Sequence, residues 1–274
     1  MTIRSSLSLL FFVSGICFLI SACSKFDIAK CQSEEECGPI LEVKKISGSL
    51  PTSPNDPIWS SNKVSKPTVA MLGPQLIANP QWPNPATQEV RVQAARTSDE
   101  IAILIEWNDS SHKKNISHSD MYTDQAALMF PMNDTEEAPP ITMGADGYPM
   151  NIWQWKEILE KPDKKNLFSG PGPLSRPDQT NQKMDMDQKK SPVEDLNAEG
   201  FSTLTQQDQQ DVKGKGNWAN GKWRTLFHRK IKSSDENDAK ISRGKLMAIA
   251  IWNGANRERN GQKGLSKWLF LKFI

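Results

Sequence analysis

Lys263 has an unusual placement in this 274-residue chain. It lies in the polar segment 253–264, which separates two strongly apolar runs, 246–252 and 268–274. A lysine between two buried segments either extends its ammonium group to water or has a chemical use for its amine. Lys263 is therefore the first candidate for chemistry.

Met143 is the second candidate, in the segment PPITMGADG (139–147). The preceding Pro139-Pro140 pair holds the chain rigidly, and Gly144 and Gly147 let the backbone approach a ligand closely. The residues alone favour a loop hydrophobe that packs on the domain. They leave open a second interpretation, in which the thioether binds a ligand.

Other kinds of chemistry have little support in the chain. The three histidines, His112, His118 and His228, lack metal-like spacing, and no Ser-His-Asp arrangement, P-loop or GxGxxG motif is present. No CxxCH motif is present, so covalent haem attachment is not predicted. The 34 basic residues nearly balance the 32 acidic ones, which argues against nucleic acid or an anionic membrane as the main partner.

The elements that position these residues are predicted to be strands. In the run 246–252 both alternating faces are apolar, which indicates a strand buried on both sides. Asn220-Gly221 predicts a tight hairpin turn. The predicted strands are 89–96, 101–107, 126–132, 223–231, 246–252 and 268–273. The fold class is all-β, an antiparallel β-sandwich with long loops and a few short helices, one of them near 153–160.

The C-terminal segment IAIWNGANRERNGQKGLSKW (249–268) resembles the signature of a known family. Other segments match in the same order: DPIW (56–59), IAILIEWND (101–109), AALMFPM (126–132), PPITMGADG (139–147), NIWQW (151–155), GFSTLT (200–205) and GKWRTLFHRKI (221–231). The family is the haem-binding gamma subunits of type II molybdenum enzymes in the dimethyl-sulfoxide-reductase superfamily. Ethylbenzene dehydrogenase, selenate and chlorate reductases and nitrite oxidoreductases have such subunits.

This resemblance implies one non-covalent b-type haem with Met143 and Lys263 as axial ligands. Lys263 matches the family's GxKxxS pattern, and Lys267 is the main competitor among the nearby lysines. His228 is the alternative ligand. The expected haem pocket also contains Trp107, Trp252, Asn253, Arg257 and Arg259. In this interpretation the two arginines neutralise haem propionates, although an exposed polar hairpin explains them equally well.

The resemblance also implies a function and partners. The chain would be an electron-transfer subunit without a catalytic site of its own, in a periplasmic-side complex of the nitrite oxidoreductase or nitrate reductase kind. Its haem would relay electrons between an iron–sulfur beta subunit, beside a molybdopterin alpha subunit, and an external carrier such as cytochrome c. The alternative is a carbohydrate-binding β-sandwich lipoprotein, because exposed tryptophans among the nine in the chain could stack on sugars.

The N-terminal segment 1–22 has the features of a lipoprotein signal peptide. Arg4 precedes an apolar run, 7–20, that is too short to span a bilayer comfortably. The run ends in Ile-Ser-Ala-Cys, a lipobox pattern, so Cys23 is expected to be lipidated and to hold the chain on the periplasmic or outer face of a membrane.

Residues 23–50 are expected to form a tether, and residues 51–274 the haem-binding sandwich domain. Cys31 and Cys37 are predicted to form a small disulfide loop within the tether, because an envelope compartment is oxidising. The polar segment 160–200 is predicted to be a surface loop that contacts a partner subunit.

Overall fold

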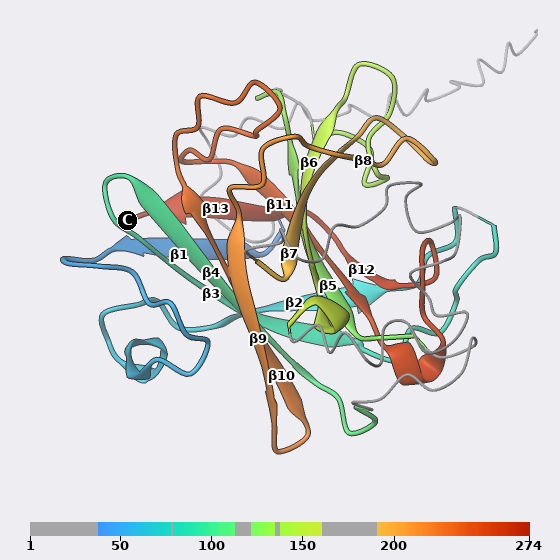
Figure 1. Ribbon diagram of the computed structural model, residues 1–274, viewed down its shortest axis with the longest axis horizontal. Helices are drawn as coiled ribbons and strands as arrows, with labels where there is room; N and C mark the ends of the chain where they lie inside the picture. The colour runs from blue at the N-terminus through green and yellow to red at the C-terminus, as the bar shows by residue number, and fades with distance from the viewer. Residues whose placement is uncertain (1–37, 78, 113–121, 135–137, 161–190) are drawn as a thin grey trace, which may run out of the picture.

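The regular secondary structure of the described residues is almost entirely β-strand (Figure 1). The computed structural model describes residues 38–77, 79–112, 122–134, 138–160 and 191–274. The strands are β1 (Ile40–Lys45), β2 (Thr68–Gly73), β3 (Glu89–Arg96), β4 (Glu100–Asn108), β5 (Gln125–Pro131), β6 (Met150–Lys156), β7 (Val193–Ala198), β8 (Thr205–Gln206), β9 (Lys213–Ala219), β10 (Lys222–Lys230), β11 (Leu246–Trp252), β12 (Gly264–Ser266) and β13 (Leu269–Phe273). Three short 3-10 helices accompany them in the described residues: η1 (Pro57–Ser60), η2 (Glu157–Leu159) and η4 (Gly254–Asn256).

The strands form two sheets that pack as a sandwich. One sheet, called sheet A, has the order β2-β3-β4-β10-β9 with β1 and β13 beside it, and the other, sheet B, has the order β8-β7-β6-β5-β11-β12. The sheets join where β12 pairs with β2 and where β11 pairs with β13. All pairings are antiparallel except those of β1 with β13 and β3. The predicted fold class is confirmed.

The core between the sheets follows from the alternation of side chains along each strand. In β11 the side chains of Met247, Ile249 and Ile251 enter this interior core, together with Leu128 of β5 and Trp153 of β6. The intervening residues of the same strands lie on the outer face of sheet B and are buried as well. The prediction that β11 is buried on both sides is therefore confirmed.

All six predicted strands are present, within one or two residues of the predicted bounds. The β9–β10 hairpin turns at Asn220 and Gly221, whose φ angles of 53° and 74° are those of the predicted tight turn. Segment 151–159 begins as β6 and ends in the short helix η2.

Two predicted boundaries are wrong. Leu41 and Val43 of β1 are fully buried in the interior core, so residues 40–45 belong to the domain and not to a tether. β7 lies within the segment predicted as a surface loop, and it pairs with β6 and β8 because Val193, Leu196 and Ala198 are apolar. The rest of that predicted loop, residues 161–190, lies outside the described residues, as do the signal segment and all four cysteines.

No helix among the described residues is both long enough and apolar enough to cross a membrane.

Candidate functional site

The outer face of sheet B carries a second apolar cluster, here called the outer cluster. An outward face of an antiparallel sandwich is usually polar, so an apolar one needs a cover. Its buried members are Ala127, Met129, Met150, Ile152, Leu196, Ala198, Ala248, Ala250 and Trp252, and the partly buried Ile141, Met143, Leu204, Leu265 and Trp268 pack against them. Four of the nine buried members are alanines, which keep the surface of the sheet low beneath the covering loops.

Met143 is held against the outer cluster by the loop between β5 and β6. Its carbonyl oxygen accepts a hydrogen bond from the Gly200 backbone amide at 2.8 Å, which joins this loop to the end of β7. Gly144 has φ +84°, and a Cβ there would lie 2.8 Å from the backbone oxygens of Ala198 and Tyr148. Only glycine fits such an approach, so the loop is fixed in place and Met143 faces the cluster.

Lys263 reaches the same cluster from the other covering loop. Its side chain is buried, and its Nζ lies 4.9 Å from the ring centroid of Trp252. Within the described residues this amine has no hydrogen-bond or ion-pair partner. Burial lowers its pKa to about 8, because water no longer stabilises the charged form. The structure thus brings Met143 and a readily deprotonated amine to one apolar surface.

Glu258 holds the loop that carries Lys263. The carboxylate is fully buried and accepts hydrogen bonds from the backbone amides of Asn253 and Ala86, both at 2.7 Å. It also accepts from Trp82 Nε1 and from Asn256 Nδ2, both at 3.0 Å. A carboxylate with four donors is a strong anchor, and it fixes the path of the chain between β11 and Lys263.

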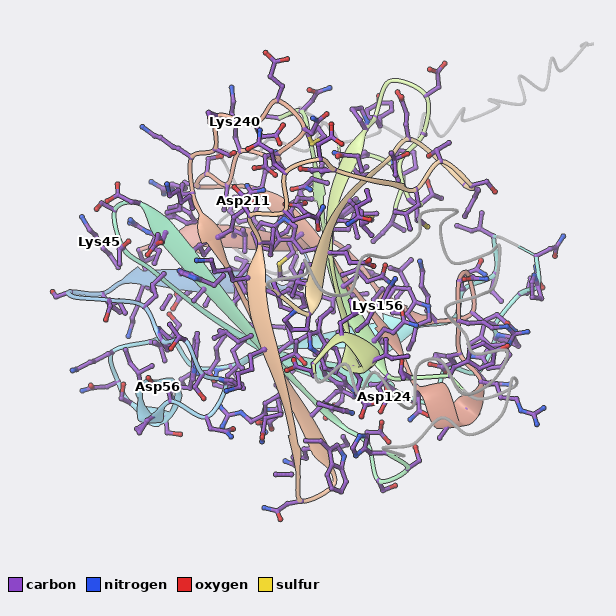
Figure 2. All side chains as sticks on the ribbon, viewed as in Figure 1. Lys45, Asp56, Asp124, Lys156, Asp211 and Lys240 are labelled. Carbon is purple, nitrogen blue, oxygen red and sulfur yellow. The ribbon has the colours of Figure 1, made fainter. Side chains whose placement is uncertain are left out.

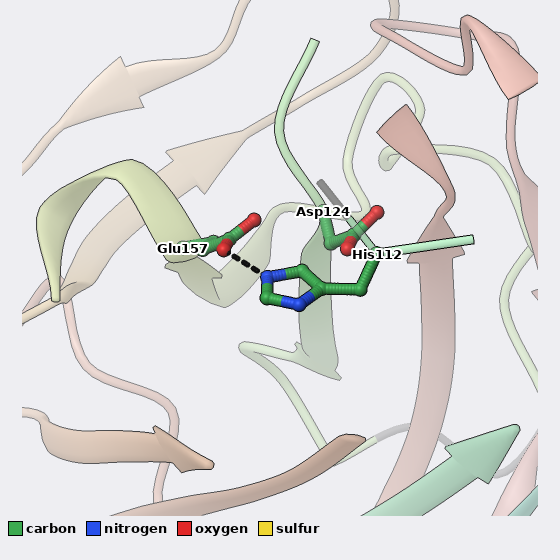
Figure 3. Close-up of side chains that lie close together, drawn as sticks. All are labelled: His112, Asp124 and Glu157. Carbon is green, nitrogen blue, oxygen red and sulfur yellow. Dashed lines mark hydrogen bonds and ion pairs between the residues drawn. The ribbon is translucent and has the colours of Figure 1, made fainter. Parts of the chain in front are cut away.

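Asp124 holds the other end of this loop. Its two oxygens accept hydrogen bonds from the Gly254 amide at 2.8 Å and from Trp223 Nε1 at 2.9 Å. Figure 3 shows Asp124 beside His112, whose imidazole pairs with Glu157. Burial, together with repulsion from Asp109, raises the pKa of Asp124 to about 8. These residues connect β5 and η2 to the start of the Lys263 loop.

The residues expected to line the haem pocket lie in different parts of the fold. Trp252 is part of the outer cluster, and Asn253 is buried beside it, where its side chain caps η4 by accepting from the Asn256 amide. Arg257 is exposed with φ 60°, and the Arg259 guanidinium lies over the Tyr122 ring at 4.8 Å.

Trp107 and His228 lie away from the outer cluster. Trp107 packs in the interior core against Trp155 and Trp223, because it occupies an inward position of β4. His228 belongs to β10 of sheet A, where its Nε2 lies 3.5 Å from Glu100. Neither residue therefore enters the site built here.

The other lysines considered as ligands have different surroundings from Lys263. Lys245 Nζ pairs with Asp134 at 2.9 Å, and Lys267 is exposed. Among these three lysines, Lys263 alone combines burial with the absence of a partner in the described chain.

A family model described as ethylbenzene dehydrogenase matches residues 56–264. The chain belongs to this ethylbenzene dehydrogenase family. The matched range contains both covering loops of the outer cluster, together with Met143 and Lys263.

Three named proteins from different organisms are similar in sequence to this chain. A protein of Haloferax mediterranei, whose name describes a heme subunit of respiratory nitrate reductase, is 27% identical over 81% of this chain and 68% of its own length. The chlorate reductase subunit gamma of Ideonella dechloratans is 24% identical over 85% of this chain and 84% of its own. The dimethylsulfide dehydrogenase subunit gamma of Rhodovulum sulfidophilum is 25% identical over 87% and 82%.

Solved structures resemble the chain only distantly. A family 9 carbohydrate-binding module from Caldicellulosiruptor kristjanssonii in complex with cellotriose aligns with a TM-score of 0.39 and 10% identity, over 85% of this chain and 94% of its own. A score of this size supports no inference about a sugar ligand.

The outer cluster itself was only partly predicted from the sequence. The doubly apolar pattern of β11 pointed to it, but the members from β6 and β7 had no such signal. The sequence predicts either a strand or a short helix for residues 151–159, and β7 lies in the segment predicted to be a surface loop. The alanines at alternate positions 248 and 250 were the available signal, since small residues on one face of a buried strand leave room for something else.

Proposed function

We propose that this chain is the electron-transfer gamma subunit of a molybdenum oxidoreductase, and that it holds one b-type haem on the outer cluster. The observation that carries the proposal is the buried, unpartnered amine of Lys263 on the same apolar surface as Met143. Membership of the ethylbenzene dehydrogenase family and the named functions of its relatives support it.

The residues present fit a haem. A porphyrin is flat and apolar, and the outer cluster offers an apolar sheet surface with small alanine side chains between two fixed loops. A thioether and a neutral amine are donors that iron accepts, and no cysteine or histidine of the described residues competes at this surface. When bound, the haem supplies one-electron chemistry through its iron.

The chain's own residues set the properties of that centre. Met143 provides a soft sulfur donor, which favours the reduced metal and raises its reduction potential. Lys263 provides a strong donor only after losing its proton, and its burial makes that loss easier. The loops that carry them cover the outer cluster, and Glu258 and Asp124 fix the Lys263 loop. Arg257 and Arg259, on that loop, are proposed to lie near the propionates.

The pH dependence of haem binding follows from the Lys263 amine. Proton and iron compete for one lone pair, so below the pKa of about 8 the affinity rises with pH and above it levels off. We expect the haem dissociation constant to rise about tenfold, which is weaker binding, when the pH falls from 7 to 6. Titrating haem into the haem-free chain at each pH measures it. The variant Lys263→Met, which cannot bind this proton, should lose that dependence. An equal slope in wild type and variant contradicts the assignment.

The proposed partners are an iron–sulfur beta subunit and a molybdopterin alpha subunit, with a cytochrome c-type protein as external carrier. A complex of the nitrite oxidoreductase or nitrate reductase kind is favoured, because the relative from Haloferax mediterranei carries the name of nitrate reductase.

The function is tested by isolating the chain from native membranes. We expect it to co-purify with molybdenum and iron–sulfur proteins, and its haem absorption to change when nitrite or nitrate is added to the complex. Recovery solely as a monomer would argue against the proposal. So would a haem whose absorption does not change with nitrite, nitrate, chlorate or selenate.

Attachment to the membrane is proposed to occur through Cys23, with a Cys31–Cys37 disulfide nearby. The support is the lipobox pattern of the sequence. Mass spectrometry of the native N-terminal peptide should find an acylated Cys23 as the first residue. An unmodified N-terminus at any other position would show that the anchor is absent.

A further inference from the structure

A second group of carboxylates, here called the three-aspartate cluster, consists of Asp195, Asp211 and Asp238. One oxygen from each lies within 4.8 Å of the others. Asp195 belongs to β7, Asp211 precedes β9, and Asp238 lies in the segment after β10. Asp195 and Asp238 are 0% and 5% exposed, whereas Asp211 is open to solvent. Figure 2 shows Asp211 well apart from Asp124, so this cluster is separate from the anchor of the Lys263 loop.

The charge of this cluster is not balanced by the protein groups beside it. Arg229 Nη1 lies 2.8 Å from Asp238 Oδ1. Burial raises the pKa of Asp195 to about 8 and also raises the pKa of Asp211, repulsion from Asp238 adds to both effects, and the Arg229 guanidinium offsets them only in part. With all three carboxylates ionised, one guanidinium would leave two negative charges, 3 minus 1, and the raised pKa of Asp195 reflects the cost of that charge. Uncompensated charge in a protein interior is costly, and one divalent cation would balance it.

Two buried carboxylate oxygens of the cluster accept no hydrogen bond from the described residues, and neither does the side-chain oxygen of Gln207, whose backbone amide bonds to Asp195. These three oxygens are Asp195 Oδ2, Asp238 Oδ2 and Gln207 Oε1. The other oxygen of each buried aspartate is occupied, since Asp195 Oδ1 accepts from Asn151 Nδ2 at 2.6 Å and Asp238 Oδ1 accepts from Arg229. Buried oxygens of this kind normally have a partner, so these positions suit a bound ligand.

Gln207 supplies an observation that is independent of the acidic residues. Its backbone amide donates to the Asp195 carbonyl at 3.0 Å, and its side-chain Nε2 donates to the Asn237 carbonyl at 2.8 Å. The carboxamide is therefore fixed between the backbone at Asp195 and the backbone beside Asp238. Because its nitrogen is used in this way, its oxygen is left as a buried acceptor.

We propose that Asp195, Asp211, Asp238 and Gln207 bind a calcium ion. Calcium takes oxygen ligands at 2.3–2.6 Å, so two of its ligands lie up to about 5.2 Å apart, and the carboxylate spacing falls within this limit. The donors are all hard oxygens, with none of the sulfur or nitrogen donors that zinc prefers. The exposed Asp211 leaves a side open for water to complete the coordination shell.

The ion would connect the two sheets at one end of the sandwich. Asp195 lies in sheet B, whereas Asp238 follows β10 of sheet A and is joined to it through Arg229. Binding to the folded chain alone stabilises that chain. This role is independent of the haem, which is proposed for the opposite, outward face of sheet B.

The test uses the full chain, treated with a chelator and then exchanged into chelator-free buffer. At calcium concentrations about 100-fold above the dissociation constant, we expect the unfolding midpoint to rise by about 5–10 °C. Isothermal titration should give one calcium per chain. The same concentration of magnesium should give a clearly smaller rise, because magnesium demands a stricter octahedral geometry.

The variant Asp211→Asn removes one charged ligand from an exposed position, so the fold should survive. We expect its calcium affinity to fall about tenfold or more. The matched control is Asp208→Asn, an exposed aspartate outside the cluster, which should behave as wild type. The proposal is overturned if calcium leaves the wild-type midpoint unchanged, if magnesium acts equally, or if Asp211→Asn retains the wild-type response.

Discussion

Replacing Lys263 by alanine should abolish the low-spin haem spectrum, or haem binding altogether, while the haem-free fold is kept. The amine is the only nitrogen donor that the described residues place at the outer cluster without another partner. Its removal also takes a poorly solvated charge out of the interior, so the haem-free variant should be at least as stable as the haem-free wild type. Absorbance of the purified holoprotein and thermal unfolding of the haem-free form measure the two effects.

Lys267→Ala is the matched control, because it removes an exposed lysine four residues away. It should leave both the spectrum and the stability unchanged. Met143→Ala should likewise lose the low-spin spectrum, whereas Met143→His should keep it at a lower reduction potential, since imidazole is the harder donor. A wild-type spectrum and potential in both Lys263→Ala and Met143→Ala would show that the ligands are other residues.

Replacing Gly254 by alanine should destabilise the domain more than any other single methyl addition at the described glycines. A Cβ at this position would lie 2.1 Å from the backbone oxygen of Tyr122 and 2.6 Å from its carbonyl carbon. Backbone atoms cannot rotate away, and separating them would break the hydrogen bond from Gly254 to Asp124. We expect a loss of about 3 kcal/mol or more in unfolding free energy and a lower midpoint of about 6–12 °C.

The matched control for this prediction is Gly73→Ala. A Cβ there would meet only the Leu265 carbonyl oxygen at 3.8 Å, an ordinary contact. Denaturant or thermal unfolding of both variants makes the comparison. Because Gly254 begins the segment that carries Lys263, the Gly254→Ala variant should also bind haem more weakly. Equal stability of the two variants would mean that the loop is packed differently from the structure described.

The strands were predictable from sequence because alternation of apolar residues reports burial directly. β11 is the clearest case, since both of its faces are apolar and both are buried. β7 was missed because it begins Val-Glu-Asp, and charged side chains are normally a sign of exposure. In the fold Glu194 pairs with Lys156, and Asp195 bonds to Asn151. Such partners come from distant parts of the chain and have no local pattern.

The candidate site also has parts that the local sequence predicts and parts that depend on distant contacts. Met143 and Lys263 were predicted as candidates because glycines and prolines mark both loops, and because the surrounding segments resemble a known family. The place of Trp107 could not be found from its neighbours, because inward and outward faces of a doubly buried strand look alike in sequence. The three-aspartate cluster joins residues from three elements, so only the fold brings it together.

A single haem held between Met143 and Lys263 is central to the proposed function. The most direct measurement is haem content together with electron paramagnetic resonance of the oxidised full-length chain, for the wild type and for the double variant Met143→Ala/Lys263→Ala. We expect one b-type haem per wild-type chain with a low-spin ferric signal, and no low-spin haem in the double variant. A wild-type chain purified from its native membrane without haem, or a double variant with an unchanged low-spin signal, would contradict it.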